Sequence, residues 1–192
     1  GPPQQWIVEW KWDGIRAQLI KRGGEAWLWS RGEELVTDRF PELAQMGKAL
    51  PDGTVLDGEI VVWRSDRVQP FAELQKRIGR KAVSARLMRD LPVVLLAYDI
   101  LEWEGRDVRG LPQAERRELL DDVVTQLQHP ALIASPMLTG GDWAELARQR
   151  EQARELGVEG LMLKQRDAAY GVGRTKESGV WWKWKIDPMS VD

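Results

Sequence analysis

The octet Glu9-Trp10-Lys11-Trp12-Asp13-Gly14-Ile15-Arg16 places a lysine, an aspartate and an arginine around a glycine. Residues 6–11 and 15–20 on its two sides alternate bulky apolar with polar residues, which is typical of strands. A lysine acts as a nucleophile only when it is unprotonated, and burial or nearby cations lower its pKa. The octet therefore predicts either a site for phosphate chemistry built on Lys11 or an exposed hairpin with charged residues on its wet side.

Outward from the octet, strand and helix signals predict an α+β fold with mainly antiparallel sheets and helices packed outside them. A tight turn at 22–25 leads into a strand at 26–29, so we expect residues 6–29 to form an antiparallel meander. Further strands are predicted at 54–63, 92–100, 158–165 and 180–186, and helices near 41, at 71–78, at 111–128 and at 142–156. The nearly continuous apolar run 92–100 is expected in mid-sheet.

Length and composition indicate one soluble globular unit. The chain has 192 residues, of which 43% are apolar and 30% charged with both signs interspersed. No run is apolar enough to span a bilayer, and the start lacks the pattern of a signal peptide. We therefore expect residues 1–5 to be a tag remnant or linker, and the protein to be cytoplasmic.

Cysteine is absent and His129 is the single histidine, which excludes disulfides, thiolate zinc sites and histidine metal clusters. Any metal must be a hard cation held by carboxylates and substrate phosphates, as Mg²⁺ usually is. The net charge of −2 argues against a protein that coats nucleic acid indiscriminately. The densest cationic run, residues 76–89, is either a solvated helix face or a contact with a phosphate backbone.

Several carboxylates fall within or beside apolar strand segments. Asp57 and Glu59 lie in the run 56–62, Asp99 follows Tyr98 at the end of another run, and Glu159 precedes a third. An unpaired charge is costly there, so these groups need a ligand, a cation or an arginine. Each segment taken singly is a weak signal, since a Tyr-Asp pair at a strand end is more often structural.

The segment Trp181-Trp182-Lys183-Trp184-Lys185 carries two lysines at strand spacing. Alternation directs Lys183 and Lys185 to the same face, where two ammonium groups repel each other unless an anion lies between them. The pattern predicts a bound phosphate, or alternatively a wet face opposite a tryptophan-rich buried face.

In order and spacing these segments resemble the covalent nucleotidyltransferase superfamily of DNA ligases, RNA ligases and messenger-RNA capping enzymes. Lys11-Trp12-Asp13-Gly14-Ile15-Arg16 resembles its K-x-D-G-x-R signature. The other four motifs are matched by residues 57–59, 98–100, 159–164 and 181–185. Ser30-Arg31-Gly32 and Glu9 look most like ATP-dependent DNA ligases.

The resemblance implies an ATP-grasp-like adenylation (nucleotidyltransferase) domain over residues 6–192. Lys11 would attack the α-phosphate of ATP, release pyrophosphate and form lysyl-AMP, and the AMP would pass to the 5′ phosphate of a DNA nick. Glu9 and Tyr98 would flank the adenine, and the two lysines would contact the α-phosphate. The implied nucleotide-binding residues are Glu9, Trp10, Arg16, Arg31, Glu59, Tyr98, Glu159, Lys183 and Lys185, with Glu59 and Glu159 also as ligands of Mg²⁺.

The resemblance also sets the expected partners and the rival functions. We expect a monomer that acts on nicked double-stranded DNA, and we expect this chain to lack the oligonucleotide-binding-fold (OB-fold) domain and the N-terminal DNA-binding domain of a complete ligase. An RNA ligase, a GTP-using capping enzyme or a non-catalytic nucleotide-binding module remain alternatives. Preference for ATP or GTP, and for DNA or RNA nicks, separates them.

Overall fold

Two sheets carry the fold, and the computed structural model describes residues 1–80, 82–171 and 181–185. The larger sheet has the order β3-β2-β4-β6-β7, with β5 added beside β4 and β8 beside β6; the smaller has the order β11-β10-β1-β9. The larger sheet contains β2 (Ile15–Arg22), β3 (Glu25–Ser30), β4 (Thr54–Arg64), β5 (Arg67–Val68), β6 (Val93–Trp103), β7 (Arg106–Asp107) and β8 (Leu132–Ala134). The smaller contains β1 (Trp6–Trp10), β9 (Met137–Leu138), β10 (Gly160–Gln165) and β11 (Trp182–Lys185).

Antiparallel pairing dominates, as the sequence predicts. Among the described strands only β6 and β8 pair in parallel. The strand expected in mid-sheet, β6, lies between β4 and β7 and is buried along nearly its whole length. The predicted α+β class is thereby confirmed.

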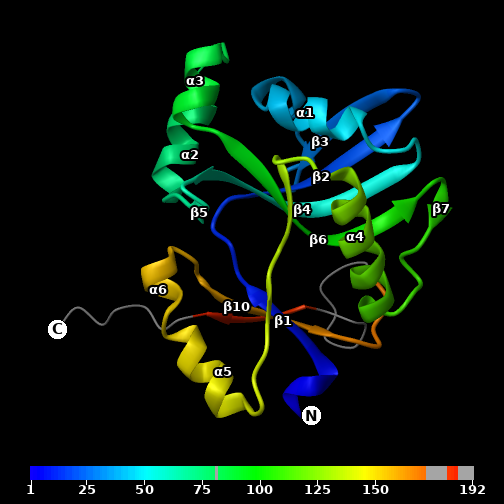
Figure 1. Cartoon of the computed structure of the whole chain (residues 1–192), viewed down its shortest axis with the longest axis vertical. Coiled ribbons are helices and arrows are strands. Elements are labelled where there is room, and N and C mark those ends of the chain that lie inside the picture. Colours follow the sequence, from blue (N-terminus) through cyan, green and yellow to red (C-terminus); the bar gives the residue numbers. More distant parts are fainter. Residues whose placement is uncertain (81, 172–180, 186–192) are drawn as a thin grey trace.

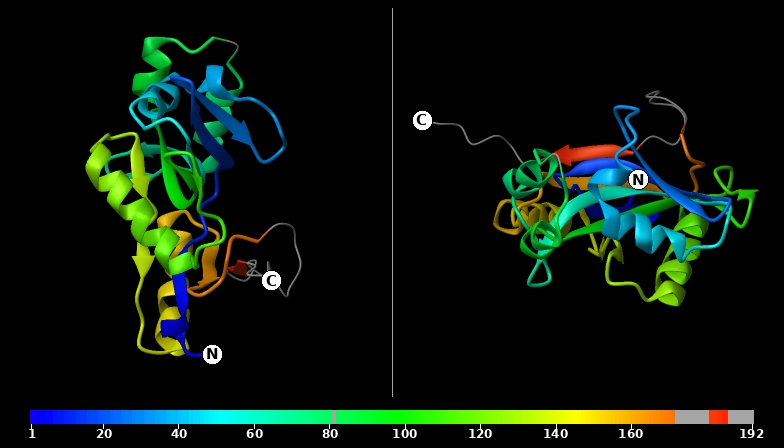
Figure 2. Two further views of the ribbon diagram at one scale, coloured as in Figure 1. Left: turned by 90° about the vertical axis from the view of Figure 1, so that its right-hand side faces the viewer. Right: turned by 90° about the horizontal axis from the view of Figure 1, so that it is seen from above.

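The helices pack against the sheets as Figures 1 and 2 show, with α1 to α3 at one end of the long axis and α5 and α6 at the other. They are α1 (Pro41–Lys48), α2 (Phe71–Ile78), α3 (Ala85–Asp90), α4 (Gln113–Leu127), α5 (Trp143–Arg150) and α6 (Ala153–Leu156). Leu43 of α1, Leu74 of α2 and Leu120 of α4 enter one hydrophobic core with Leu56 and Leu95 of the larger sheet. None of the helices in the described part of the chain has the length and apolar character needed to cross a bilayer.

The predicted meander over residues 6–29 is wrong at its first strand. The hairpin of β2 and β3 forms, with its turn at Gly23 and Gly24 in the left-handed region. However, β1 belongs to the smaller sheet, where β10 pairs with one of its edges and β9 with the other. Residues 11–14 therefore cross from one sheet to the other instead of closing a turn. Alternation along a strand indicates which residues share a face, but it does not identify the neighbouring strand.

The helix predicted at 142–156 is two helices, α5 and α6, separated at Glu151 and Gln152. Its ends are as predicted, because Asp142 caps the start and Gly157, at φ +72°, follows the end. The break has a packing reason. Leu146 enters a cluster with Val8 of the smaller sheet, whereas Ala153 packs with residues of the larger sheet in another cluster.

Candidate active site

A cavity of about 90 Å³ lies where the two sheets face each other. The smaller sheet and residues 11–14, the segment that crosses between the sheets, form the end of the cavity that contains Lys11. The larger sheet forms the opposite wall. Its lining residues are Glu9, Trp10, Lys11, Trp12, Arg16, Arg31, Glu59, Tyr98, Met162, Lys164, Trp181 and Lys183. Apart from Glu159 and Lys185, every residue predicted to bind nucleotide therefore lines this one cavity.

Lys11 is held at the cavity by the crossing segment. Its backbone N–H donates to the carbonyl of Gly160 at 2.8 Å, which extends the pairing of β1 with β10 by one residue. Gly14 then lets the chain pass close to β4, because a Cβ built on it would lie 2.2 Å from the carbonyl oxygen of Ile60. The Lys11 ammonium contacts the carboxylate of Glu159 directly, so Glu159 adjoins the cavity through Lys11.

Asp13, which the sequence left out of the predicted site, adjoins the same contact. Burial raises its pKa, and the negative charge of Glu159 and a hydrogen bond to that residue raise it further. Two acidic groups thus lie together beside Lys11. The aspartate of the K-x-D-G-x-R pattern was the signal that could have found this residue.

Glu59 faces Lys11 from strand β4. The Tyr98 hydroxyl donates to its carboxylate at 3.1 Å and the Gly14 N–H at 3.2 Å. Burial nevertheless dominates and raises the pKa of Glu59 to about 7. The neighbouring Gly58 lets β6 approach, since a Cβ there would lie 2.5 Å from the Leu96 carbonyl oxygen.

Arg16 reaches the cavity from β2 in a fixed orientation. Its guanidinium donates to both oxygens of Asp57, at 3.3 and 2.8 Å, and the hydroxyl of Tyr170 donates to Asp57 at 3.1 Å. Burial alone would lower the pKa of Arg16, but the Asp57 carboxylate raises it above its usual value. The Trp181 ring lies 4.8 Å from the guanidinium. Arg16 is thus a permanent, positioned cation.

Asp99 turns out to be structural. It is fully buried behind the cavity, and its carboxylate accepts hydrogen bonds from Arg116 at 2.9 Å, from Gln113 at 3.2 Å and from the Ile100 N–H at 2.8 Å. The expectation that buried carboxylates need a partner is confirmed, since Asp99 and Asp57 each have an arginine.

Sequence reasoning missed the two arginines on α4, Arg116 and Arg117. Both are buried, at positions that share the helix face of the core residues Leu120 and Val123. Arginine in the apolar stripe of an amphipathic helix was the available signal. Lys164, another buried cation, lies behind Tyr98 at 4.5 Å from its ring.

The predicted lysine pair is only partly brought to the cavity. Lys183 lines it, whereas Lys185 pairs with Gly160 at the far end of β11 and is exposed. Residues 180 and 186, the predicted ends of this strand, lie outside the described residues.

The described residues of the cationic run at 76–89 do not line the cavity. Arg77 is fully buried and donates to Glu42 on α1 at 2.7 Å, so this residue is structural. Lys76 and Arg86 form exposed ion pairs with neighbours on their own helices. For Lys76 and Arg86, the interpretation of this run as a solvated helix face is therefore supported.

The acidic groups fit Mg²⁺ better than a cation that demands a full protein cage. No cluster of three or more metal-binding side chains occurs within residues 1–80, 82–171 and 181–185. Mg²⁺ commonly binds through one or two carboxylates together with substrate phosphates and water. Glu59, which lines the cavity with Lys11, and Glu159, which contacts Lys11, are carboxylates of this kind.

Solved structures with clear sequence similarity have the same fold. The ligase domain of M. tuberculosis LigD is 32% identical with a TM-score of 0.73, and the match covers 94% of this chain and 54% of that one. Mycobacterial DNA ligase D complexed with ATP and MES is 33% identical with a TM-score of 0.71, with the same coverage. At 20% identity, the Chlorella virus DNA ligase-adenylate shares the fold, with a TM-score of 0.67 over 94% of this chain and 62% of that one.

Curated relatives and a family model lead to the same group. A probable DNA ligase of Koribacter versatilis is 35% identical over 97% of this chain, and a DNA ligase of Aeropyrum pernix is 36% identical over 96%. The chain spans only 36% and 31% of the length of these two relatives. The model of the ATP dependent DNA ligase domain matches residues 2–185. With nearly all of its length matched, this chain belongs to the ATP-dependent DNA ligase domain family.

Proposed function

We propose that this chain takes AMP from ATP onto Lys11 and passes it to the 5′ phosphate of a nick in double-stranded DNA. The observation that carries the proposal is the position of Lys11, at a cavity whose other wall presents Arg16, Glu59 and Tyr98. The similar mycobacterial ligase described with ATP supports the choice of nucleotide.

The chemistry follows from the groups around Lys11. The lone pair of its Nζ forms a bond to the α-phosphorus, and the bond from that phosphorus to the bridging oxygen breaks, so that pyrophosphate leaves with the electron pair. The Lys11 ammonium gives one proton to Glu159, the carboxylate in contact with it, before the attack, which makes the lone pair available. The second proton, lost as the phosphoramidate forms, passes to solvent. In the second step an oxygen of the DNA 5′ phosphate attacks the same phosphorus, and Lys11 leaves and regains a proton.

The remaining predicted residues bind and orient the nucleotide. Tyr98 stacks on the adenine and Glu9 accepts a hydrogen bond from it, while Arg16, Arg31 and Glu59 hold the ribose and its surroundings. Trp10 closes the cavity, and Lys183 and Lys185 contact the α-phosphate. Cations fixed in advance stabilise the charge that the transferred group gains on its oxygens.

Nucleotide binding requires the cavity to widen. Its volume of about 90 Å³ is well below the roughly 300 Å³ at the small end of ligand pockets. Trp181 lies against Tyr98, at 5.4 Å between ring centroids, and 4.0 Å from the Lys164 ammonium. Displacement of this indole is the simplest way to open the space over Tyr98.

Mg²⁺ is the proposed metal, with Glu59 and Glu159 as its protein ligands. When bound, it would neutralise charge on the phosphate oxygens. Because Mg²⁺ keeps much of its coordination for phosphates and water, two carboxylates are sufficient.

We propose that residues 6–192 form the adenylation domain of a monomeric ligase, with residues 1–5 as a short linker. Residues 3–5 form a 3₁₀ turn, and Trp143 donates to the Gly1 carbonyl at 2.9 Å. Sealing a nick would further use OB-fold and DNA-binding domains, in keeping with the greater length of the relatives.

Intact mass tests the covalent step. The chain is incubated with Mg²⁺ and ATP, or with Mg²⁺ and GTP, alongside the variants Lys11→Ala and Lys48→Ala. The exposed Lys48 lies on α1 and serves as the matched control. We expect the mass of AMP to be added to the wild type and to Lys48→Ala with ATP, and no addition to Lys11→Ala.

Two results would count against the proposal. An adduct that persists in Lys11→Ala would move the chemistry to another residue, and a preference for GTP would favour a capping-type enzyme. If no adduct forms, calorimetry with ATP decides. Absence of ATP binding there would overturn the ligase function for this chain.

A further inference from the structure

Glu9 is buried at the cavity and receives no well-directed hydrogen bond from the described residues. Its side chain lines the cavity and the residue is 1% exposed. Neither carboxylate oxygen has a hydrogen-bond partner among the described residues. A buried charged group in this condition is costly to the fold, so it indicates a bound group that completes its hydrogen bonds.

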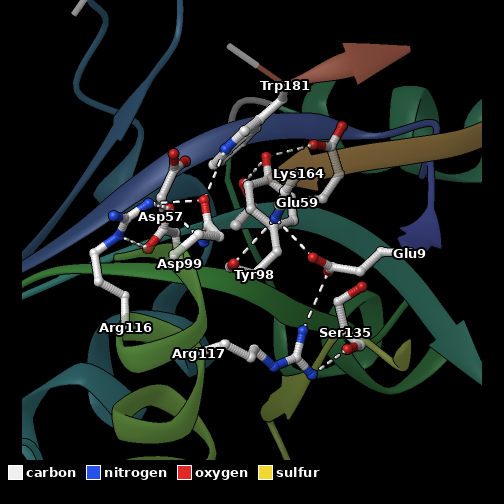
Figure 3. A network of polar contacts seen from close by, with 12 residues as sticks. Glu9, Asp57, Glu59, Tyr98, Asp99, Arg116, Arg117, Ser135, Lys164 and Trp181 are labelled. Carbon is white, nitrogen blue, oxygen red and sulfur yellow. Dashed lines mark hydrogen bonds and ion pairs between the residues drawn. The ribbon is translucent and has the colours of Figure 1, made fainter. Parts of the chain in front are cut away.

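Two buried cations flank this carboxylate (Figure 3). The ammonium of Lys164 lies 2.7 Å from one oxygen, and a guanidinium nitrogen of Arg117 lies 3.4 Å from the other. These contacts are ionic and lack the directions of hydrogen bonds. They balance the charge of Glu9 while leaving its lone pairs available.

Both cations are also held in place by hydrogen bonds to other residues. Lys164 donates to the Tyr98 carbonyl at 3.1 Å, and Arg117 donates to the Ser135 carbonyl and, at 2.9 Å, to Asp121. Helix α4 therefore holds Glu9 through Arg117, a residue that does not line the cavity.

The same network reaches the lysine segment. The indole N–H of Trp12, next to Lys11, donates to the Ser135 hydroxyl at 2.9 Å. Glu9 and Lys11 are two residues apart at the end of a strand, so both project to the cavity side. The base-binding end and the reacting end of the cavity are thus positioned by one set of contacts.

We propose that Arg117 is a positioning residue that sets base selectivity, by holding the Glu9 carboxylate toward position 6 of the bound purine. A carboxylate only accepts hydrogen bonds. Adenine carries an amino group at position 6, which donates, whereas guanine carries a carbonyl there, which is repelled. This inference rests on the proposed function, because it concerns how the same cavity selects ATP.

Loss of Arg117 should reduce the preference for ATP over GTP more than it reduces the rate of lysyl-AMP formation. In Arg117→Gln, Glu9 would keep only Lys164 and would turn toward it, so the acceptor direction would be lost. A hydrogen bond to a charged group corresponds to a discrimination on the order of 10- to 100-fold. We expect the preference for ATP over GTP to fall by that factor.

The test measures single-turnover formation of the lysyl-nucleotide by the full chain with three probes. These are ATP, GTP and purine riboside triphosphate, which has only hydrogen at position 6. The quantity compared is the ratio of kcat/KM between ATP and each analogue. A variant that is partly unfolded loses activity toward all three equally, so the ratio is insensitive to a purely structural defect.

Neighbouring residues supply the controls. Arg116→Gln alters the adjacent buried arginine, which pairs with Asp99 and not with Glu9, and should leave the ratio unchanged. Arg117→Lys should restore part of it. Should Arg117→Gln fail to fold, Asp121→Asn loosens Arg117 more gently and should lower the ratio, whereas the exposed neighbour in Asp122→Asn should not.

The outcomes separate the two proposals. A lysyl-nucleotide that forms with unchanged selectivity in Arg117→Gln, or in Asp121→Asn where that variant carries the test, overturns the role of Arg117 and leaves the proposed function standing. If the wild type forms no adduct but binds ATP, the same comparison is made with the Kd values of ATP and GTP. If it binds no ATP, both proposals are overturned. An equal fall of selectivity in Arg116→Gln would make the effect a general one of helix α4 and would also overturn the assignment.

Discussion

Arg116 and Arg117 are consecutive residues of α4, both buried and each facing a buried carboxylate, yet the two pairs differ. The carboxylate of Asp99 accepts hydrogen bonds from Arg116, from Gln113 and from its own neighbouring backbone. The carboxylate of Glu9 has ionic contacts with Arg117 and Lys164 and accepts no hydrogen bond from the described residues.

The difference separates a group that holds the fold from one that binds. Asp99 has no capacity left for a ligand and lies away from the cavity. Glu9 lines the cavity with its lone pairs unused, and Glu59 opposite is disfavoured as an anion by its burial. Burial alone therefore does not identify a binding carboxylate. A binding carboxylate is identified when it lines a cavity and either accepts no hydrogen bond from the protein or has a pKa shifted by burial.

The largest effect is expected when the satisfied pair is broken. Asp99→Asn leaves the fully buried Arg116 without a counter-charge, so the free energy of unfolding should fall by about 3–5 kcal/mol. Urea denaturation measures it. The exposed pair of Asp107 with Arg109 is a control, and Asp107→Asn should leave the urea midpoint unchanged.

Failure to fold would still inform the comparison. The double variant Asp99→Leu with Arg116→Met removes both charges and should recover most of the lost stability. If Asp99→Asn lowered the free energy of unfolding by less than about 1 kcal/mol, the pair of Asp99 with Arg116 would not be the one that stabilises the fold.

The next effect is the pH dependence of Glu59. Burial raises the pKa of its carboxyl from the ordinary 4.5 to about 7. Between these values the folded protein keeps a proton that the unfolded chain releases, so stability falls as pH rises from about 4.5 to 7. Glu59→Gln should therefore be more stable than the wild type at pH 8, by up to about 3 kcal/mol, and equal to it at low pH.

Denaturation of both proteins across that pH range measures the difference. Glu33→Gln removes an exposed carboxylate and controls for the change in net charge. A constant difference between wild type and Glu59→Gln at every pH would contradict the role of burial.

The smallest effect on stability is expected from Glu9→Gln, at about 1–2 kcal/mol. Arg117 keeps the counter-charge of Asp121. Lys164 loses its counter-charge but keeps the Tyr98 carbonyl and the ring faces of Tyr98 and Trp181, at 4.5 and 4.0 Å, which stabilise a cation. The same denaturation series measures this loss. A cost equal to that of Asp99→Asn would erase the distinction between the two pairs.

Much of the site was predictable because each motif is local. The octet around Lys11, the Asp57-Gly58-Glu59 segment and Tyr98 all line or adjoin one cavity, and Gly14 and Gly58 occur where neighbouring backbone comes closest. The meander and the single helix at 142–156 were wrong, since both depend on which distant residues pack together. Arg117 lies on a helix with no motif of its own, so only its place in an apolar stripe marked it.

By itself the sequence determined the α+β class, the positions of the longer strands and of most helices, and the set of groups available for phosphate chemistry. These follow from side-chain periodicity and from residue type, which are properties of short segments. The short strands β5, β7, β8 and β9 and the helix α3 were not predicted. Tertiary structure decided that β1 joins β10, that Asp99 is satisfied and that Glu9 is not. Each of these depends on contacts between residues far apart in the chain, and the partner in such a contact is chosen by packing rather than by local pattern.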